Sequence, residues 1–247
     1  MGSDRADSSV AGSRSPGSFL RWCVYKVPGV MPTLHAILRR MQLVLLSYFR
    51  DPADADRIRQ VYRECKCELQ PLEAYAILTL ARAQAGLEGD MAEVGMFQGG
   101  SAKLICGVKG AAPFWGFDTF EGLVDVGKDD THWGTTFFRN GAYRANEETV
   151  RRYIGDGAGI TLTKGYFPGT AGAAADRRFS FVHLDVDTYA STLESLRFFW
   201  PRLVDRGLIV THDSHAAGVA RAAQEFVAET GARAPTNPSQ LRQEHIG

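Results

Sequence analysis

Two carboxylates and a neighbouring imidazole–carboxylate pair are the side chains of this sequence best suited to chemistry. Asp185 and Asp187 emerge at alternate positions from an apolar run, so both point to one side. A later apolar run ends in His212 and Asp213. Because a carboxylate that ends a buried strand is costly to leave unpaired, we expect a metal ion, an amine or a hydrogen-bond cluster beside it. Asp185, His212 and Asp213 could together bind a divalent cation. Mg²⁺ comes first, with Mn²⁺, Fe²⁺ and Zn²⁺ as more imidazole-tolerant alternatives, and a helix cap at Asp213 beside a satisfied core histidine is the structural alternative.

A glycine-rich turn lies earlier in the chain. An apolar run ends in Glu93, and a predicted helix begins at Ser101, with Gly95, Gly99 and Gly100 between them. Glycine lets the backbone turn sharply and approach a ligand, and a helix N-terminus favours anionic groups. The spacing differs from the GxGxxG that cradles a dinucleotide pyrophosphate, so it favours a ligand without a pyrophosphate. The alternative is that these glycines only shape a tight turn.

Asp118 ends the next predicted strand. At this place in an α/β sheet a carboxylate faces ribose hydroxyls. Glu93 and Asp118 would then lie at two successive strand ends that face one nucleoside-like ligand. A plain helix or turn cap is the alternative for Asp118.

These residues need a parallel sheet to bring them together. From residue 89 onward, short apolar runs alternate with helical stretches, which is typical of βαβ units. The predicted strands cover residues 91–94, 114–117, 160–163, 179–184 and 208–211, and the predicted helices between them cover 101–108, 147–153, 191–199 and 218–228. The sequence therefore predicts an α/β fold with a Rossmann-like, doubly wound, mostly parallel sheet.

The flanking segments predict a helical section before this sheet. Residues 1–18 are rich in Ser and Gly and lack the apolar core of a secretory signal, which predicts a disordered tail. Residues 19–88 form the N-terminal helical section, with helices over 33–49, within 53–65 and over 71–85. Packing of this section against the sheet is favoured over a cap on the active site or a dimer surface.

The predicted sheet domain spans residues 89–247. Its C-terminal end differs from the end of most such domains. Residues 235–247 are polar and lack the apolar alternation of finishing hairpin strands. We therefore expect an edge that is absent or supplied by a partner chain. Together with the helical section, this makes a homodimer a second expectation.

Composition limits the partners. The 28 Lys and Arg residues balance 28 Asp and Glu residues, so no electrostatic attraction to nucleic acid or an anionic membrane is built in. No apolar stretch reaches the roughly 20 residues of a membrane-spanning helix. The four cysteines show neither zinc-site spacing nor the density of a disulfide scaffold, which fits a reducing cytosol. The sequence predicts a cytoplasmic protein with a small-molecule partner.

Taken together, several segments resemble the macrocin O-methyltransferase family, class I S-adenosylmethionine-dependent methyltransferases of antibiotic biosynthesis. The resemblance covers about residues 88–227, and its matching pieces are Glu93-Val94-Gly95 followed by Gly99-Gly100, Asp118-Thr119-Phe120-Glu121-Gly122-Leu123, Gly165-Tyr166-Phe167, Leu184-Asp185-Val186-Asp187-Thr188-Tyr189 and Trp200-Pro201-Arg202-Leu203. It implies an O-methyltransferase that acts, with S-adenosylmethionine and a divalent metal, on a hydroxyl of a sugar or of a sugar-bearing natural product.

The resemblance also implies roles for the residues around the cofactor. In the family, the glutamate and the glycines of the first strand end surround the methionine part of S-adenosylmethionine, and the acidic residue after the second strand holds its ribose. The corresponding cofactor-binding residues of this sequence are Glu93, Gly95, Gly99, Ser101 and Asp118.

The family's metal lies between the first aspartate of the fourth-strand motif and two adjacent aspartates after the fifth strand. These correspond here to Asp185, His212 and Asp213, so His212 stands where the family has an aspartate. The metal would bind a substrate diol, lower the pKa of one hydroxyl and aim its oxygen at the sulfonium methyl.

Two residues are candidates for the general base. His132, in the polar segment 128–140, comes first because neutral imidazole is poised near pH 7, although a solvated loop histidine is the alternative. Asp187 is the second candidate, and a role as partner of the cofactor's amino group is preferred for it.

Two other functions compete with methyl transfer. A protein that binds S-adenosylmethionine without chemistry is favoured by His212 and by the polar C-terminus. A nicotinamide-dependent oxidoreductase is disfavoured because GxGxxG is missing. Which molecule accepts the methyl group is not indicated by any pattern of residues.

Overall fold

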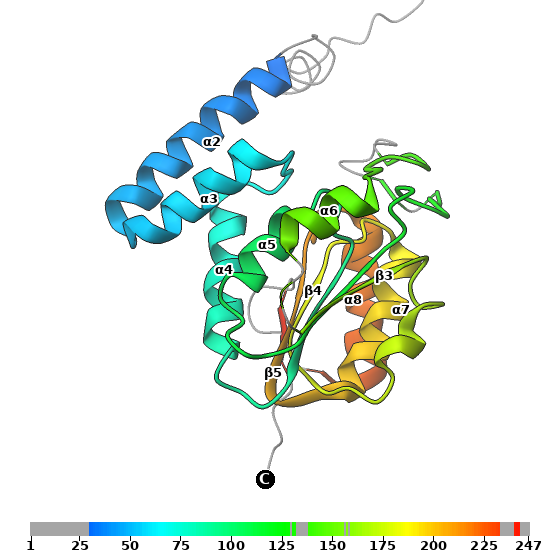
Figure 1. The fold of residues 1–247 in the computed structure, drawn as a ribbon. Helices are drawn as coiled ribbons and strands as arrows, with labels where there is room; N and C mark the ends of the chain where they lie inside the picture. Colours follow the sequence, from blue (N-terminus) through cyan, green and yellow to red (C-terminus); the bar gives the residue numbers. More distant parts are fainter. Residues whose placement is uncertain are drawn as a thin grey trace, which may run out of the picture.

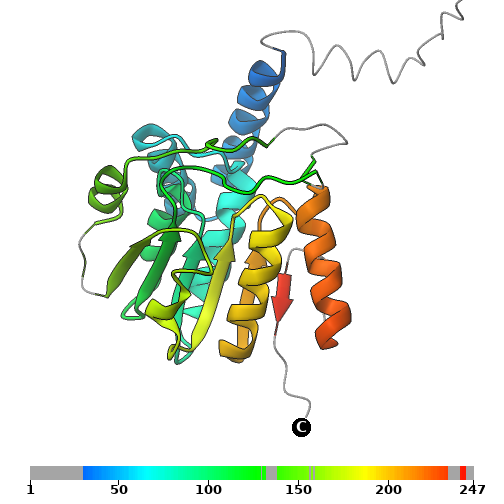
Figure 2. The same ribbon diagram turned by 90° about the vertical axis from the view of Figure 1, so that its right-hand side faces the viewer.

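The computed structural model describes residues 30–128, 130–131, 138–155, 157, 159–232 and 240–242. A single sheet contains β1 (Asp90–Val94), β2 (Phe114–Asp118), β3 (Ile160–Lys164), β4 (Phe179–Leu184), β5 (Leu203–Thr211) and β6 (Gln240–Arg242). Their order is β3-β2-β1-β4-β5-β6, with β1 to β5 parallel and β6 antiparallel to β5 (Figures 1 and 2). The carboxyl ends of the five parallel strands therefore meet at one end of the sheet, where ligands bind in such folds.

Helices cover both faces of this sheet. One group contains α2 (Val30–Phe49), α3 (Pro52–Glu64), α4 (Pro71–Gln84), α5 (Gly100–Cys106) and α6 (Glu147–Ile154), and the opposite face carries α7 (Tyr189–Phe199) and α8 (Ala217–Thr230). In Figure 1, α2 and α3 stand out from the sheet, and α4 connects them to it. None of the helices in the described ranges is both long enough and apolar enough to cross a bilayer.

Burial on both faces explains the apolar strands. All five residues of β1 are buried, and successive residues point to opposite sides of the sheet. Met91 belongs to the same core cluster as Leu78 of α4, whereas Ala92 belongs to the cluster that contains Leu196 of α7. A strand that is covered on both sides by helices reads as a continuous apolar run. The predicted doubly wound α/β fold is confirmed.

The predicted helices and strands are all present, with small differences at most of their ends. The largest difference is in β5, which begins at Leu203 instead of residue 208. Asp205 and Arg206 are exposed in this early part of the strand, and the ladder with β4 shifts register there. A strand that begins with polar residues and an irregular register cannot be recognised there from a run of apolar residues. The predicted tail over residues 1–18 lies outside the described residues.

The expectation for the C-terminal edge is wrong. The polar segment after residue 235 was expected to leave the edge of the sheet absent or filled by a partner chain. Instead β6 of the same chain pairs with β5, with Leu208 opposite Arg242 and Val210 opposite Gln240. This pairing uses backbone groups, so it requires no alternation of apolar side chains.

The helical section contains an ion pair between a buried aspartate and a partly exposed arginine, and its contribution to stability can be tested. Asp54 of α3 is 3% exposed, and Arg82 of α4 donates two hydrogen bonds to its carboxylate, of 2.9 and 2.5 Å. These bonds hold the pKa of Asp54 below its ordinary value. Because the folded-state pKa is the lower one, the pair stabilises the fold above the ordinary carboxyl range, and this contribution is lost as the pH falls.

We expect Asp54→Asn to lower the free energy of unfolding by about 1–3 kcal/mol near pH 7. The loss should shrink as the pH falls from 7 to about 3, because the carboxyl of the unfolded chain, with a pKa of about 3.9, takes up its proton in this range. Urea denaturation at the two pH values measures it. The matched control is Asp56→Asn, because Asp56 pairs with Arg59 at 2.6 Å but is 69% exposed, and we expect a loss below about 0.5 kcal/mol. Equal losses for both variants would contradict the assignment.

Candidate active site

A cavity of about 510 Å³ opens at the carboxyl ends of the parallel strands. Its wall combines strand-end loops with the helical section at the N-terminus. Residues at the strand ends or following them include Gly95, Ser101, Asp118, Tyr143, Tyr166, Asp185, Asp187, His212, Asp213 and His215, and residues from or next to α2 and α4 include His35, Arg39, Gln70 and Glu73. The helical section therefore packs on the sheet and also closes one side of the cavity.

The turn after β1 places backbone against backbone. Gly95 has a φ of +83°, and a Cβ atom at this position would lie 1.9 Å from the carbonyl oxygen of Asp185. Hydrogen bonds fix both sides of the contact, since Gly95 N donates to Phe117 O at 2.8 Å and Asp185 N donates to Val94 O at 2.9 Å. Only glycine fits here, and the turn brings the loop after β1 next to the carboxylate-bearing end of β4.

Asp118 organises the same turn from the end of β2. Its Oδ2 accepts hydrogen bonds from the backbone N–H groups of Met96 and Phe97 at 2.6 and 2.9 Å, and its Oδ1 accepts one from Phe120 at 2.6 Å. Burial nevertheless raises the pKa of Asp118, against the effect of these donors. The residue also lines the cavity. One carboxylate thus caps two loops and faces the space where a ligand would lie.

Glu93 lies behind the cavity wall. The residue is fully buried, and its Oε1 is 2.7 Å from Nδ1 of His183, its register neighbour on β4. Burial raises the pKa of Glu93, and His183 opposes this effect. Among the other predicted cofactor residues, Ser101 lines the cavity, and Gly99 forms the N-cap of α5 with a φ of +83°. The strand end therefore presents its backbone and Ser101 to the cavity.

The predicted metal ligands converge. Asp185, His212 and Asp213 each offer one ligand atom, and these atoms lie within 4.8 Å of one another. Nδ1 of His212 is 3.1 Å from Oδ1 of Asp185 and 3.1 Å from Oδ2 of Asp213. This nitrogen is buried and has no hydrogen-bond partner. Two carboxylate oxygens around an otherwise unsatisfied imidazole nitrogen fit a divalent cation.

The charges of this cluster depend on one another. Burial alone would lower the pKa of His212, but the carboxylates of Asp185, Asp213 and Glu73 outweigh it and raise the pKa well above its ordinary value. Burial, followed by the hydrogen bond with Asp213 and the charge of Asp185, raises the pKa of Asp187. Burial also opposes ionisation of Asp213, but His212 holds its pKa below the usual range. The negative charge of these carboxylates is thus balanced by one imidazolium. A bound divalent cation could balance this charge instead.

Two residues of this site were missed by the sequence analysis. Oε2 of Glu73, on α4, lies 3.4 Å from Nε2 of His212, and Nε2 of His215 lies 3.4 Å from Oδ1 of Asp213. Burial would raise the pKa of Glu73, but the hydrogen bond and charge of His212 hold it below its ordinary value. The sequence from Gln70 to Glu73 carries only the signal of a helix start, a capping box.

The two candidate bases of the sequence analysis are His132 and Asp187. His132 lies outside the described residues. Asp187 lines the cavity, is 9% exposed and has a φ of +60°. An aspartate tolerates this left-handed conformation better than most residues do, and here the turn keeps Asp187 beside the cluster.

The profile of the macrocin-O-methyltransferase (TylF) family matches residues 71–239. A tetracenomycin C rhamnosyl 4′-O-methyltransferase from Streptomyces olivaceus is 31% identical over 141 residues, which are 52% of this chain and 54% of that protein. Demethyldecarbamoylnovobiocin O-methyltransferase from Streptomyces niveus is 27% identical over 137 residues, 51% of this chain and 52% of that protein. The matches thus span about half the length of these curated relatives.

Solved structures share the fold. The calicheamicin methyltransferase CalS11 superposes with a TM-score of 0.61 at 17% identity, and covers 99% of this chain and 100% of its own. The O-methyltransferase NovP superposes with a TM-score of 0.57 at 21% identity, over 69% of this chain and 78% of its own. The fold is therefore that of known O-methyltransferases, and it includes the N-terminal helices in the case of CalS11.

Proposed function

Because the chain belongs to the macrocin-O-methyltransferase family, we propose that it transfers a methyl group from S-adenosylmethionine to a hydroxyl of a sugar or of a sugar-bearing natural product. One observation carries the proposal. A single cavity contains both the glycine turn with Asp118 and the cluster of Asp185, His212 and Asp213. A methyl donor held at the first and a hydroxyl held at the second would lie next to each other, and such positioning supplies much of the rate in group transfer.

The residues divide into two groups in this proposal. The turn around Gly95, with Ser101, receives the methionine part of the cofactor, Asp118 its ribose and Asp187 its amino group. Asp185, His212 and Asp213 would hold a divalent cation, Mg²⁺ first and Mn²⁺ as the alternative. A bound cation would supply charge stabilisation for a hydroxyl that loses its proton. His132 remains the predicted base that takes this proton, with Asp187 as the alternative.

The acceptor is proposed from the relatives. The curated match from Streptomyces olivaceus is named for the methylation of a rhamnosyl 4′-hydroxyl, and the other match for the methylation of a novobiocin precursor. A sugar offers neighbouring hydroxyls, and a vicinal diol can chelate one cation. We therefore place a glycosylated natural product or its activated sugar in this cavity.

Calorimetric titration with S-adenosylhomocysteine tests the proposal without knowledge of the acceptor. The titration is run in chelator, in Mg²⁺ and in Mn²⁺. We expect binding in all three conditions and separate uptake of a metal ion by the protein. Binding of NADH in place of S-adenosylhomocysteine would contradict methyl transfer, and cofactor binding without metal uptake would contradict only the role of the cation.

We also infer that two copies of the chain associate through α2. One side of this helix packs on the body through the buried Leu46, but the other side exposes a row of apolar residues. In this row Ile37, Met41, Val44 and Tyr48 are 52%, 54%, 62% and 84% exposed. The row follows the spacing of three and four residues by which one helix packs on another. A self-complementary helix surface is typical of two-fold homodimers.

The double substitution Ile37→Glu and Val44→Glu should convert a dimer into a monomer, because it places charges within the exposed row. Light scattering measures the mass, and S-adenosylhomocysteine binding should persist. The control is Arg40→Asp, at an exposed position of α2 outside the row. A wild-type protein that is monomeric at all concentrations would contradict the inference.

A further inference from the structure

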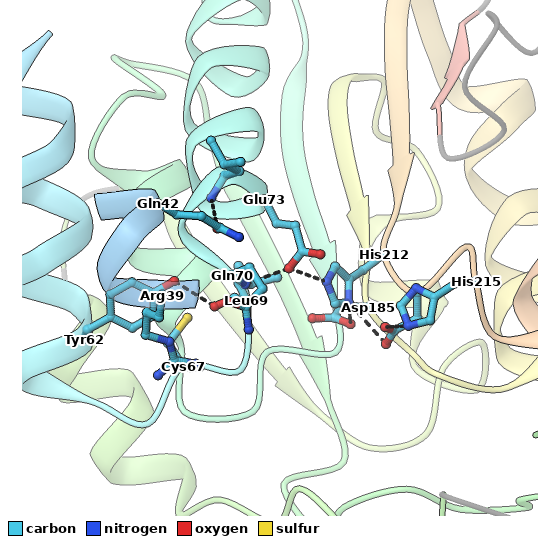
Figure 3. Close-up of polar contacts among 12 residues, drawn as sticks. Arg39, Gln42, Tyr62, Cys67, Leu69, Gln70, Glu73, Asp185, His212 and His215 are labelled. Carbon is cyan, nitrogen blue, oxygen red and sulfur yellow. Dashed lines mark hydrogen bonds and ion pairs between the residues drawn. The ribbon is translucent and has the colours of Figure 1, made fainter. Parts of the chain in front are cut away.

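The two ring nitrogens of His212 have different surroundings (Figure 3). Nδ1 faces the oxygens of Asp185 and Asp213, each 3.1 Å away, and makes no hydrogen bond. Nε2 faces Oε2 of Glu73 at 3.4 Å. The Nε2 side of the His212 ring therefore contacts α4 of the helical section, and its Nδ1 side faces the two aspartates of the proposed metal site.

A carboxylate can only accept a hydrogen bond, so the proton shared between Glu73 and His212 belongs to Nε2. A cation that binds Nδ1 takes the place of the proton there. The ring then keeps its proton on Nε2 and has its lone pair on Nδ1, the nitrogen between the two aspartates. In metalloproteins the carboxylate that accepts from the second ring nitrogen fixes the orientation of a histidine ligand and raises its basicity. Glu73 stands in this relation to His212.

Glu73 is itself held in place by several contacts. Its Oε2 accepts a hydrogen bond from Gln70 N at 2.6 Å in the capping box of α4. The loop before α4 is tied to α3, because Tyr62 of α3 donates to Leu69 O at 2.7 Å. The same loop is tied to α2, because Arg39 donates to Cys67 O at 3.2 Å. The first turn of α4 is tied to α2 as well, because Oε1 of Gln42 accepts from Leu72 N at 3.1 Å.

We propose that Glu73 is a positioning residue of the metal site: it orients His212 from α4 so that Nδ1 joins Asp185 and Asp213 as a ligand. The proposal rests on the proposed metal-assisted function and deepens it. It also gives the helical section a part in the site. This role of Glu73 does not depend on which molecule accepts the methyl group, since Glu73 acts through His212.

Metal binding is the direct test, measured by calorimetric titration of the cofactor-free protein with Mn²⁺. We expect Glu73→Ala to weaken Mn²⁺ binding by about 10- to 100-fold, the usual effect of removing a partner of a histidine ligand. Glu73→Gln can still accept from Nε2 and preserves the capping box. It should recover part of the affinity and all of the thermal stability of the metal-free protein.

Two controls separate this role from other effects. Glu68 also lines the cavity but pairs with Lys66 at 2.7 Å, so Glu68→Gln removes an equal charge without touching His212. Gln70→Ala disturbs the start of α4 and leaves the Glu73 carboxylate. Both should bind Mn²⁺ within about threefold of wild type, since the charge of Glu68 at the rim is largely screened and Gln70 carries no charge.

A second measurement observes His212 itself. In ¹⁵N-detected spectra of the protein loaded with diamagnetic Zn²⁺, the Nε2–H of His212 should be protected from exchange in wild type and lose this protection in Glu73→Ala. Mn²⁺ affinity in Glu73→Ala within twofold of wild type would overturn the proposal, as would an equal loss in Glu68→Gln or Gln70→Ala. A wild-type protein that binds S-adenosylhomocysteine but no metal would refute the metal site itself.

Discussion

Turnover of an identified acceptor should fall by about 100-fold or more in Asp185→Ala. The residue contributes one of the three ligand atoms of the proposed metal site, and its Oδ1 is 3.1 Å from Nδ1 of His212. A metal ion supplies several kcal/mol of charge stabilisation, and 100-fold corresponds to about 2.7 kcal/mol. Steady-state kinetics at saturating S-adenosylmethionine would measure the loss, and Mn²⁺ uptake should disappear with it.

The same variant contains its own control. The backbone of Asp185, which contacts the glycine turn, is unchanged by the substitution. We therefore expect the affinity for S-adenosylhomocysteine to stay within about threefold of wild type, because removing one cavity side chain leaves most of a preformed site intact. Undiminished turnover in Asp185→Ala would exclude the metal mechanism. A loss of cofactor binding together with turnover would instead place Asp185 in the cofactor site.

Gly95→Ala should have the largest effect on the fold. A Cβ atom at this position would lie 1.9 Å from the backbone oxygen of Asp185, and the φ of +83° is unfavourable for any residue with a side chain. The backbone oxygen cannot move easily because hydrogen bonds hold both β1 and β4 at this level. We expect a loss of about 4 kcal/mol or more in the free energy of unfolding, together with loss of cofactor binding.

Gly110→Ala is the matched control for this prediction. Gly110 also has a positive φ, +61°, but no heavy atom lies within 4 Å of the place of its Cβ. Its substitution should therefore show the cost of the backbone conformation alone, about 1 kcal/mol. Urea denaturation and S-adenosylhomocysteine titration of both variants separate the cost of the backbone conformation from the cost of the steric clash. Equal stability of the two variants would mean that the turn after β1 can open without cost.

The sequence was sufficient for those parts of the site that follow from strand order. β4 and β5 are neighbouring parallel strands, with Leu184 opposite Thr211. The residues that follow them in the chain, Asp185 and His212, must then lie side by side. The predicted grouping of Asp185, His212 and Asp213 needed nothing more than this rule.

Contacts that depend on how a helix lies over the sheet could not be predicted in this way. Glu73 and His212 are 139 residues apart in the chain, and helical periodicity tells which side of α4 is apolar but not which strand end it reaches. The burial of Glu93 also follows from the strand and not from the spacing of polar residues. Glu93 lies inside β1, two residues after Met91 and on the same side of the sheet, so its side chain points toward the covering helices instead of the open end.

The two borders of the sheet limit how copies of this protein can join. β6 occupies the free edge of β5 with only three residues. At the other border, β3 has one buried residue, exposes Thr161 and Lys164, and ends in Lys164, which pairs with Glu121 at 3.3 Å. Very short outer strands and charged outer residues are the means by which proteins prevent strand addition and the aggregates that grow from it. Strand addition is therefore disfavoured at both borders, and association between copies is left to the surfaces of helices.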